Sequence, residues 1–148
     1  MSRHAARERA LETLFQMDIN DVSLEDASAY THSIHDESQK PSVYDEAYYQ
    51  QLLTRVLDYR HQLDAIIDQL SKDWELDRMP GVDRNILRLS LYEMLYEVDV
   101  PPAVVINEAV ELAKSYSSNE SRKFINGVLS NALKLLPELK KNHPSLNV

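Results

Sequence analysis

The sequence contains no cysteine among its 148 residues, which excludes disulfides and thiolate chemistry. Glycine occurs only twice, and strict alternation of apolar and polar residues is rare, so the pattern favours helices over strands. No apolar run approaches the roughly 20 residues that a membrane-spanning helix needs. The first ten residues, MSRHAARERA, lack the apolar stretch of a signal peptide. We therefore expect an all-α, cytoplasmic protein that has no membrane contact.

The sequence motifs of common enzyme classes are missing as well. There is no glycine-rich phosphate loop and no GxSxG motif around a nucleophilic serine. His32, His35 and Asp36 could chelate a metal from one face of a helix, but they lie in a polar segment. We expect no catalytic residues, no bound metal and no cofactor.

The negative charge is concentrated in one segment. The formal net charge is −8, and residues 18–46 carry −7 of it, since they hold eight acids and one base, Lys40. The rest of the chain is therefore close to neutral, and local basic patches are possible despite the acidic total. Two such patches are residues 1–9, with three arginines, and residues 114–134, with four cations against Glu120.

Apolar periodicity divides the chain into helices. The expected helices cover residues 3–19, a short stretch after Ser23 as N-cap, 43–71 with a kink or split at 59–61, 83–98, a stretch opened by Pro101-Pro102, and 121–136. The helix over 83–98 is apolar nearly all round, which is typical of a central helix, and Asp83 is expected to cap it. We expect a single domain with an N-terminal subdomain over about 1–71 and a C-terminal one over about 83–136.

Three stretches, in this order, resemble the NusB family of bacterial transcription antitermination factors. They are ARERALETLFQ, WELDRMPGVDRNILRLSLYEMLY and VPPAVVINEAVELAKSYSSNESRKFINGVL. The resemblance covers about residues 3–20 and 63–135, and it implies an all-α fold of two packed three-helix bundles without catalytic activity. It also implies a partner, the small-subunit ribosomal protein NusE, and a ligand, the single-stranded boxA RNA of ribosomal RNA leaders. Together these nucleate an antitermination complex on RNA polymerase.

The first helix carries cations on its apolar side. At about 100° per residue, Arg3 and Arg7 point the same way as Ala10 and Leu14. Such arginines either extend along the core and pair with nearby acids or bind phosphates. The family resemblance favours RNA contact, and His4 beside them could stack on a base or simply be exposed.

The last helix carries a second candidate RNA contact. Phe124 borders the apolar stripe, so it either completes the core or stacks on a base. Gly127 costs about 1 kcal/mol relative to alanine inside a helix; close helix packing is the favoured explanation, and close approach of an RNA backbone is the alternative. Ser118, Asn119 and Ser121 can donate hydrogen bonds to RNA, cap this helix, or do both. The residues assigned to RNA are Arg3, His4, Arg7, Ser118, Glu120, Arg122, Lys123 and Phe124.

The connector before the central helix is the expected protein-binding side. Charged residues of alternating sign surround one tryptophan in this connector. This pattern is expected of a protein-binding surface, and local helix capping with a packed tryptophan would also produce it. The resemblance places the ribosomal-protein contact in this region and aligns Asp83 with an acidic position that faces the partner. The residues assigned to this contact are Trp74, Asp77, Arg78, Asp83 and Arg84.

Two functions of different classes remain open at this point. The favoured one is an RNA- and protein-binding antitermination factor, which works by assembly. The alternative is a helical adapter that binds only proteins. The sequence leaves the oligomeric state open between monomer and homodimer.

Overall fold

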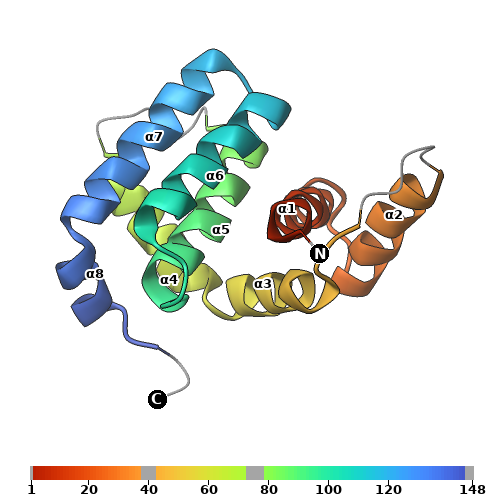
Figure 1. The fold of residues 1–148 in the computed structure, drawn as a ribbon, viewed down its shortest axis with the longest axis horizontal. Coiled ribbons are helices and arrows are strands. Elements are labelled where there is room, and N and C mark those ends of the chain that lie inside the picture. Colours follow the sequence, from red (N-terminus) through yellow and green to blue (C-terminus); the bar gives the residue numbers. More distant parts are fainter. Residues whose placement is uncertain (1, 38–42, 73–78, 146–148) are drawn as a thin grey trace. The chain divides into compact units, whose positions relative to one another are not determined.

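Eight α-helices account for most of the described chain, which in the computed structural model comprises residues 2–37, 43–72 and 79–145 (Figure 1). They are α1 (Arg3–Asn20), α2 (Leu24–Glu37), α3 (Glu46–Asp58), α4 (Arg60–Leu70), α5 (Gly81–Tyr96), α6 (Pro102–Tyr116), α7 (Asn119–Lys134) and α8 (Leu136–Asn142). Extended pairing in the described part is limited to an isolated bridge between Ser2 and Tyr44. The all-α prediction is confirmed. No described helix combines the length and apolar character that crossing a bilayer requires.

The chain divides into two compact units, Met1–Thr54 and Arg55–Val148. The sequence suggested a division near residue 71, but α4 packs on α5 and α7 and so belongs to the second unit. The first unit holds α1, α2 and most of α3, and the second holds α4 to α8.

The first unit begins with two capped helices. Ser2 caps α1 by accepting a hydrogen bond from the Ala5 backbone N–H at 3.1 Å. The helix ends at Asp21, whose φ of 50° and ψ of 44° place it in the left-handed region that short polar side chains tolerate. Ser23 then accepts from the Asp26 N–H at 3.1 Å, which confirms the predicted start of α2.

The predicted split of the long helical pattern occurs at Tyr59, between α3 and α4. Its ring is buried and stacks on Tyr96, with the centroids 4.0 Å apart. Burial raises the pKa of Tyr96 to about 12, because the phenolate would lose its hydration. The break in the chain thus coincides with an aromatic cluster that fixes its position.

The helix α5 is the centre of the second unit, as the sequence predicted. Every residue from Asn85 to Leu95 is buried, and α4, α6, α7 and α8 all pack on it. Arg88 is 5% exposed, and its Nε and Nη2 donate to the two carboxylate oxygens of Asp64 in α4 at 2.8 and 3.1 Å. This bidentate ion pair compensates the charge of the buried Arg88 guanidinium inside the second unit.

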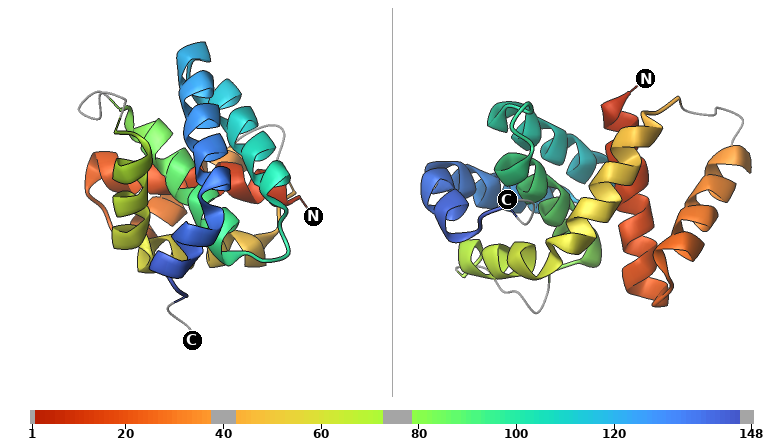
Figure 2. Two further views of the ribbon diagram at one scale, coloured as in Figure 1. Left: turned by 90° about the vertical axis from the view of Figure 1, so that its left-hand side faces the viewer. Right: turned by 90° about the horizontal axis from the view of Figure 1, so that it is seen from below.

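The helix α8 was not predicted from the sequence, in which the last expected helix ends at residue 136. In the structure α8 follows α7 almost directly, with Pro137 in its first turn, where proline is tolerated (Figure 2). Leu139 is buried, and the Tyr96 hydroxyl donates to the His143 carbonyl at 2.9 Å. These contacts hold the segment against the second unit.

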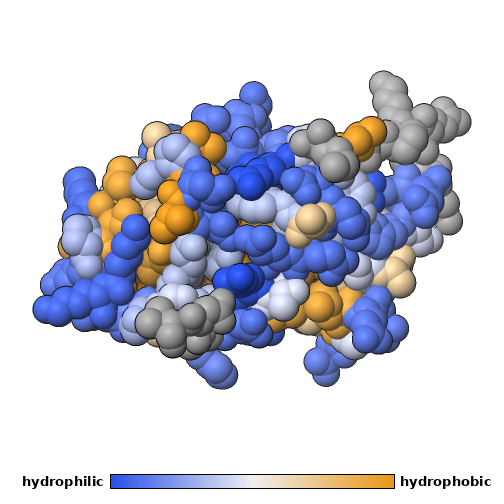
Figure 3. Space-filling view, turned by 60° about the horizontal axis from the view of Figure 1, so that its bottom comes forward, coloured by the Kyte–Doolittle hydropathy of each residue, from blue (hydrophilic) through white to orange (hydrophobic). Residues whose placement is uncertain are grey.

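Figure 3 shows the apolar side chains of one face of the molecule. On the face shown in Figure 3, hydrophilic side chains predominate and the apolar groups are divided by them. The large exposed apolar residues of the described chain are Ile19, Tyr30, Ile34, Val43, Val98, Val104 and Leu133. Scattered residues of this kind are normal for a protein surface, so the charged and aromatic groups carry more information about ligands.

Candidate nucleic-acid interface

The start of α7 is fixed by a serine cap. The Ser118 side chain accepts a hydrogen bond from the Ser121 backbone N–H at 3.1 Å, and the helix begins at Asn119. This is two residues earlier than the sequence suggested. Glu120 lies in the first turn, where a carboxylate complements the positive end of the helix dipole. Ser118 therefore has a structural role in the cap, whatever else it contacts.

A buried carboxylate holds the loop that precedes α7. Asp83 is 2% exposed, and its Oδ1 and Oδ2 accept hydrogen bonds from Ser117 Oγ at 2.8 Å and from Ser121 Oγ at 2.6 Å. The expectation that Asp83 caps α5 was wrong, because α5 begins at Gly81 with Pro80 as its N-cap. The side chain points towards the loop before α7, so the expected outward-facing carboxylate is instead an internal link.

Arg122 and Phe124 lie on opposite edges of α7 although only one residue separates them. The buried stripe of this helix contains Ser121, Ile125, Val128, Leu129 and Ala132. At about 100° per residue, Arg122 and Phe124 are about 160° apart around the axis and flank this stripe. Both are half-buried, whereas Lys123 and Gly127 are exposed on the face between them. The cations and the aromatic ring therefore do not form one compact patch.

A basic hollow lies at the Arg122 edge of α7. It has a volume of about 510 Å³ and is lined by Val110 of α6 and by Asn119, Arg122, Lys123 and Asn126 of α7. Arg122 Nη2 donates to Asn119 Oδ1. Within the part of the chain that the structure describes, neither Arg122 nor Lys123 forms an ion pair with a carboxylate. The hollow thus offers positive charge next to amide groups that both donate and accept hydrogen bonds.

Two residues of this hollow, Val110 and Asn126, were not singled out from the sequence. The signal for Asn126 was present, because positions 119, 122, 123 and 126 follow the spacing of one helix face. Val110 could not be found in this way, because only the packing of α6 on α7 brings it to the site.

The two predicted arginines of α1 lie over one tyrosine ring. The guanidinium carbons of Arg3 and Arg7 are 4.2 and 5.5 Å from the centroid of Tyr48. Arg3 is exposed, whereas Arg7 is only 5% exposed. His4 lies 3.4 Å from the Glu8 carboxylate, one turn later on the same helix. Arg3 is thus the arginine of this pair that can reach a ligand, and Arg7 is part of the packing beneath it.

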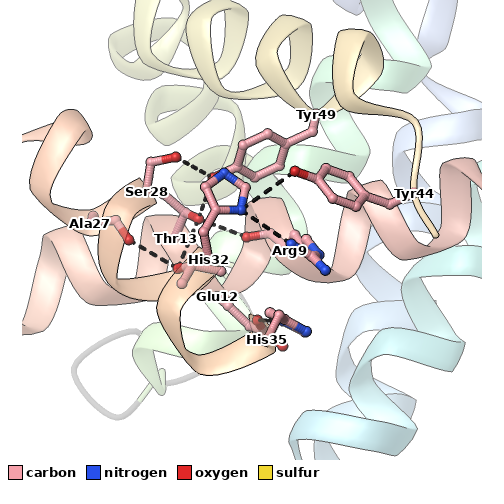
Figure 4. A network of polar contacts seen from close by, with 10 residues as sticks. Arg9, Glu12, Thr13, Ala27, Ser28, His32, His35, Tyr44 and Tyr49 are labelled. Atoms are coloured by element: carbon pink, nitrogen blue, oxygen red, sulfur yellow. Dashed lines mark hydrogen bonds and ion pairs between the residues drawn. The ribbon is translucent and has the colours of Figure 1, made fainter. Parts of the chain in front are cut away.

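A polar network orients α2 and α3 on α1 inside the first unit (Figure 4). Thr13 Oγ1 is 2.9 Å from the Tyr49 hydroxyl, which is also 2.8 Å from Ser28 Oγ. Arg9 Nη1 donates to His32 Nδ1 at 3.1 Å, and its guanidinium lies 3.9 Å from the centroid of Tyr44. Because a guanidinium only donates, Nδ1 of His32 carries no proton.

The histidines of the polar segment are occupied in this network. His32 accepts from Arg9, while Nε2 of His35 lies 2.7 Å from Oε2 of Glu12 (Figure 4). No group of three metal-ligating side chains occurs among the residues that the structure describes.

Tyr44 and Glu46 form a coupled pair at the start of α3. The Tyr44 hydroxyl donates to the Glu46 carboxylate. Burial, and then this hydrogen bond, raises the pKa of Tyr44 to about 12. The same hydrogen bond lowers the pKa of Glu46, since it stabilises the ionised carboxylate.

Most of the predicted protein-binding residues lie outside the described chain. Trp74, Asp77 and Arg78 fall in residues 73–78, which the structure does not describe. Arg84 is half-buried, and its guanidinium nitrogens lie 3.6 Å from the carboxylates of both Asp64 and Asp68 in α4. The structure therefore brings Arg84 to α4 and Asp83 to the loop before α7.

Residues 4–134 match the NusB family. The chain belongs to this family. It is 44% identical to the transcription antitermination protein NusB of Bacillus subtilis (strain 168). The 131 aligned residues cover 88% of this chain and 94% of the relative. It is 43% identical to that of Listeria innocua serovar 6a, over 88% of this chain and 95% of the relative. Family membership makes the chain a transcription antitermination factor, which is not an enzyme.

Solved structures of NusB proteins share the fold. The structure of T. maritima NusB matches with a TM-score of 0.77 and 31% identity, over 96% of this chain and 98% of that one. A structure of the antitermination factors NusB and NusE in complex with dsRNA matches with a TM-score of 0.72 and 27% identity, over 90% of this chain and 98% of that one.

Proposed function

We propose that this chain binds boxA-type single-stranded RNA of ribosomal RNA leaders together with the ribosomal protein NusE, as part of an antitermination complex on RNA polymerase in the cytoplasm. The observation that carries the proposal is the basic hollow of α7, where Arg122 and Lys123 have no acidic partner in the described chain. Cations without acidic partners beside a surface hollow are suited to phosphates. The solved NusB–NusE complex with dsRNA supports the choice of partner and ligand.

The RNA-binding roles follow from exposure and chemistry. Lys123 and Arg122 position the RNA through phosphates, and Arg3 does the same from the start of α1. Phe124 is half-buried at the edge of the buried stripe of α7, and we assign the exposed part of its side chain to stacking on a base. Arg7 holds Tyr48 beneath Arg3, with no direct RNA contact of its own.

Three further assigned residues have subordinate roles in this proposal. Ser118 holds the helix start that presents the cations. Glu120 accepts hydrogen bonds from base amino groups or from 2′-hydroxyls, because a carboxylate repels phosphate. His4, next to Glu8, lies at the margin of the RNA surface and contributes least.

The NusE contact is assigned to the start of α5 and the connector before it. Arg84, Trp74, Asp77 and Arg78 form the proposed contact, and Asp83 positions the adjacent loop from inside. Because Asp83 joins α5 to the start of α7, binding of NusE at this end would stabilise the RNA-binding surface. A homodimer, where it forms, must leave this surface open in the active state.

The decisive experiment is a titration of labelled boxA-type RNA in the presence of NusE, with the wild type and with Phe124→Ala. We expect the variant to bind about tenfold or more weakly, since stacking contributes roughly 1–3 kcal/mol per base. A duplex of the same sequence serves as a second ligand, because the solved complex contains dsRNA. A folded wild type that binds neither RNA, with NusE present, would leave the protein-only adapter as the better account.

A further inference from the structure

One side of α2 packs on α1, and a second helical face beside that side is exposed. Ala27 and Thr31 are buried, and Thr31 Oγ1 accepts a 3.1 Å hydrogen bond from Thr13 Oγ1 of α1. The exposed face, which we call the outer face of α2, consists of Asp26, Ala29, Tyr30, Ser33 and Ile34. These positions follow the i, i+3, i+4, i+7, i+8 spacing of one helix face. The helix thus has two faces, of which one is covered in the described chain.

Two large apolar side chains form the centre of the outer face. Tyr30 is 52% exposed and Ile34 is 49% exposed. Residues four apart are neighbours on a helix, with Cβ atoms about 5–6 Å apart. Ala29 and Ser33 are small, so they leave room beside this pair for the side chains of a second helix. Apolar anchors spaced by one turn are the feature by which a helical surface holds a partner helix.

The charge around the outer face is of one sign. No lysine or arginine occurs between Arg9 and Lys40, and the acids of that stretch are Glu12, Asp18, Asp21, Glu25, Asp26, Asp36 and Glu37. Both histidines of α2 contact side chains of α1, because His32 Nδ1 accepts from Arg9 and His35 Nε2 lies 2.7 Å from Glu12 (Figure 4). The outer face therefore lies in a negative field.

This negative field decides between the possible occupants. RNA and anionic lipid surfaces are polyanions, so the acids of α2 repel them. A second copy of this chain would bring its own acidic stretch against this one, and like charges across an interface oppose binding. A basic protein surface is attracted instead, and complementary charge also speeds its association.

We propose that the outer face of α2 binds a basic amphipathic helix of another protein. The apolar side of that helix packs on Tyr30 and Ile34, while its lysines and arginines reach Glu25 and Asp26 in the first turn of α2 and Asp36 near its end. The face is small, so the contact is weak and depends on salt. It is independent of the proposed RNA-binding function, whose hollow is formed by α6 and α7.

The test measures binding of labelled synthetic peptides to the full chain by fluorescence anisotropy. The probe is a helical peptide of the length of α2, with leucines on one face and lysines on the other. A scrambled peptide of the same composition lacks the apolar face, and a third peptide carries glutamate in place of lysine. We expect the basic amphipathic peptide to bind, the scrambled one to bind several-fold more weakly, and the acidic one not to bind.

Variants of the chain locate the contact. Tyr30→Ser combined with Ile34→Ser should weaken binding of the basic amphipathic peptide by about tenfold or more, because both apolar anchors are lost. Val98→Ser, at an apolar residue that is 93% exposed in the second unit, is the matched control and should bind as the wild type does. Asp36→Lys should weaken binding several-fold at low salt, whereas Glu111→Lys, at an exposed acid of α6, should have a smaller effect.

Three results would overturn the proposal. Equal binding of the amphipathic and scrambled peptides, or of the wild type and the double serine variant, would show a general attraction of charges. Self-association of the wild type in sedimentation experiments, lost in the double serine variant, would make a second copy the occupant. The double serine variant should also bind boxA-type RNA with NusE as the wild type does. A loss of that binding would place the outer face in the RNA and NusE assembly instead.

Discussion

Ser121 Oγ donates a 2.6 Å hydrogen bond to Oδ2 of Asp83, and this bond joins the first turns of α7 and α5. Ser117 Oγ occupies the other carboxylate oxygen at 2.8 Å, so both ends of the loop before α7 are held by one buried side chain. The loop consists of Ser117 and Ser118, so it has no apolar side chain of its own. The position of the proposed RNA-binding cations therefore depends on a residue that RNA does not touch.

Asp83→Asn should weaken this link while keeping its shape. An asparagine side chain has one oxygen and one NH₂ group, so one of the two serine hydroxyls loses its acceptor. We expect a loss of about 1–3 kcal/mol in the free energy of unfolding, measured with urea. RNA affinity should fall as well, because the loop is held less firmly. Asp68→Asn, at an exposed acid of α4, is the control and should change stability by less than about 1 kcal/mol.

Lys123→Gln should lower the salt dependence of RNA binding. Each phosphate contact to single-stranded nucleic acid contributes about 0.7 to the slope of log K against log salt concentration. The slope should fall by about that amount in this variant, whereas Phe124→Ala should weaken binding with little change in slope. Binding curves at four or more salt concentrations measure this. An unchanged slope in Lys123→Gln would show that Lys123 makes no phosphate contact.

Arg3→Ala and Arg7→Ala should have different effects, although both guanidinium groups lie over Tyr48. Arg7 is 5% exposed, so its removal should lower the free energy of unfolding by about 1–3 kcal/mol through lost packing. Arg3 is exposed, so its removal should cost little stability and should weaken RNA binding. Paired urea unfolding and RNA titrations decide this. The assignment fails if Arg7→Ala is as stable as the wild type and binds RNA more weakly.

Tyr44→Phe should raise the pKa of Glu46 towards its ordinary value. The Tyr44 hydroxyl bond is the largest cause of the lowered pKa. A carboxyl group whose pKa is lowered in the folded state stabilises the fold above its unfolded pKa, and that contribution is lost as the pH falls through the folded value. The variant should therefore show less loss of stability on acidification below about pH 4.5. Carboxyl-detected NMR titration gives the pKa directly, and Gln50→Ala is a milder comparison at the same carboxylate.

The helices follow from the sequence because apolar periodicity, serine caps and prolines act over a few residues. Ser23 as a cap, the break at Tyr59 and the buried α5 were all predicted for that reason. The short α8 was missed because it depends on Leu139 and on the contact of Tyr96 with the chain end, which no local pattern contains.

The candidate site was only partly predictable, because it depends on contacts between distant segments. Asp83 was recognised as important, but its direction depends on serines more than thirty residues away in the chain. The separation of Arg122 from Phe124 follows from helix geometry alone, whereas the hollow needs Val110 from α6. The burial of Arg7 depends on Tyr48 from α3.

The most direct test of the account is one titration of boxA-type RNA against the wild-type chain, with and without NusE. RNA alone should bind weakly, because the basic groups are few, and NusE should tighten binding by at least about tenfold, or about 1.4 kcal/mol. The affinity in both series should fall as salt is added. An RNA affinity that is undetectable with NusE present, for a chain shown to be folded, would contradict the account.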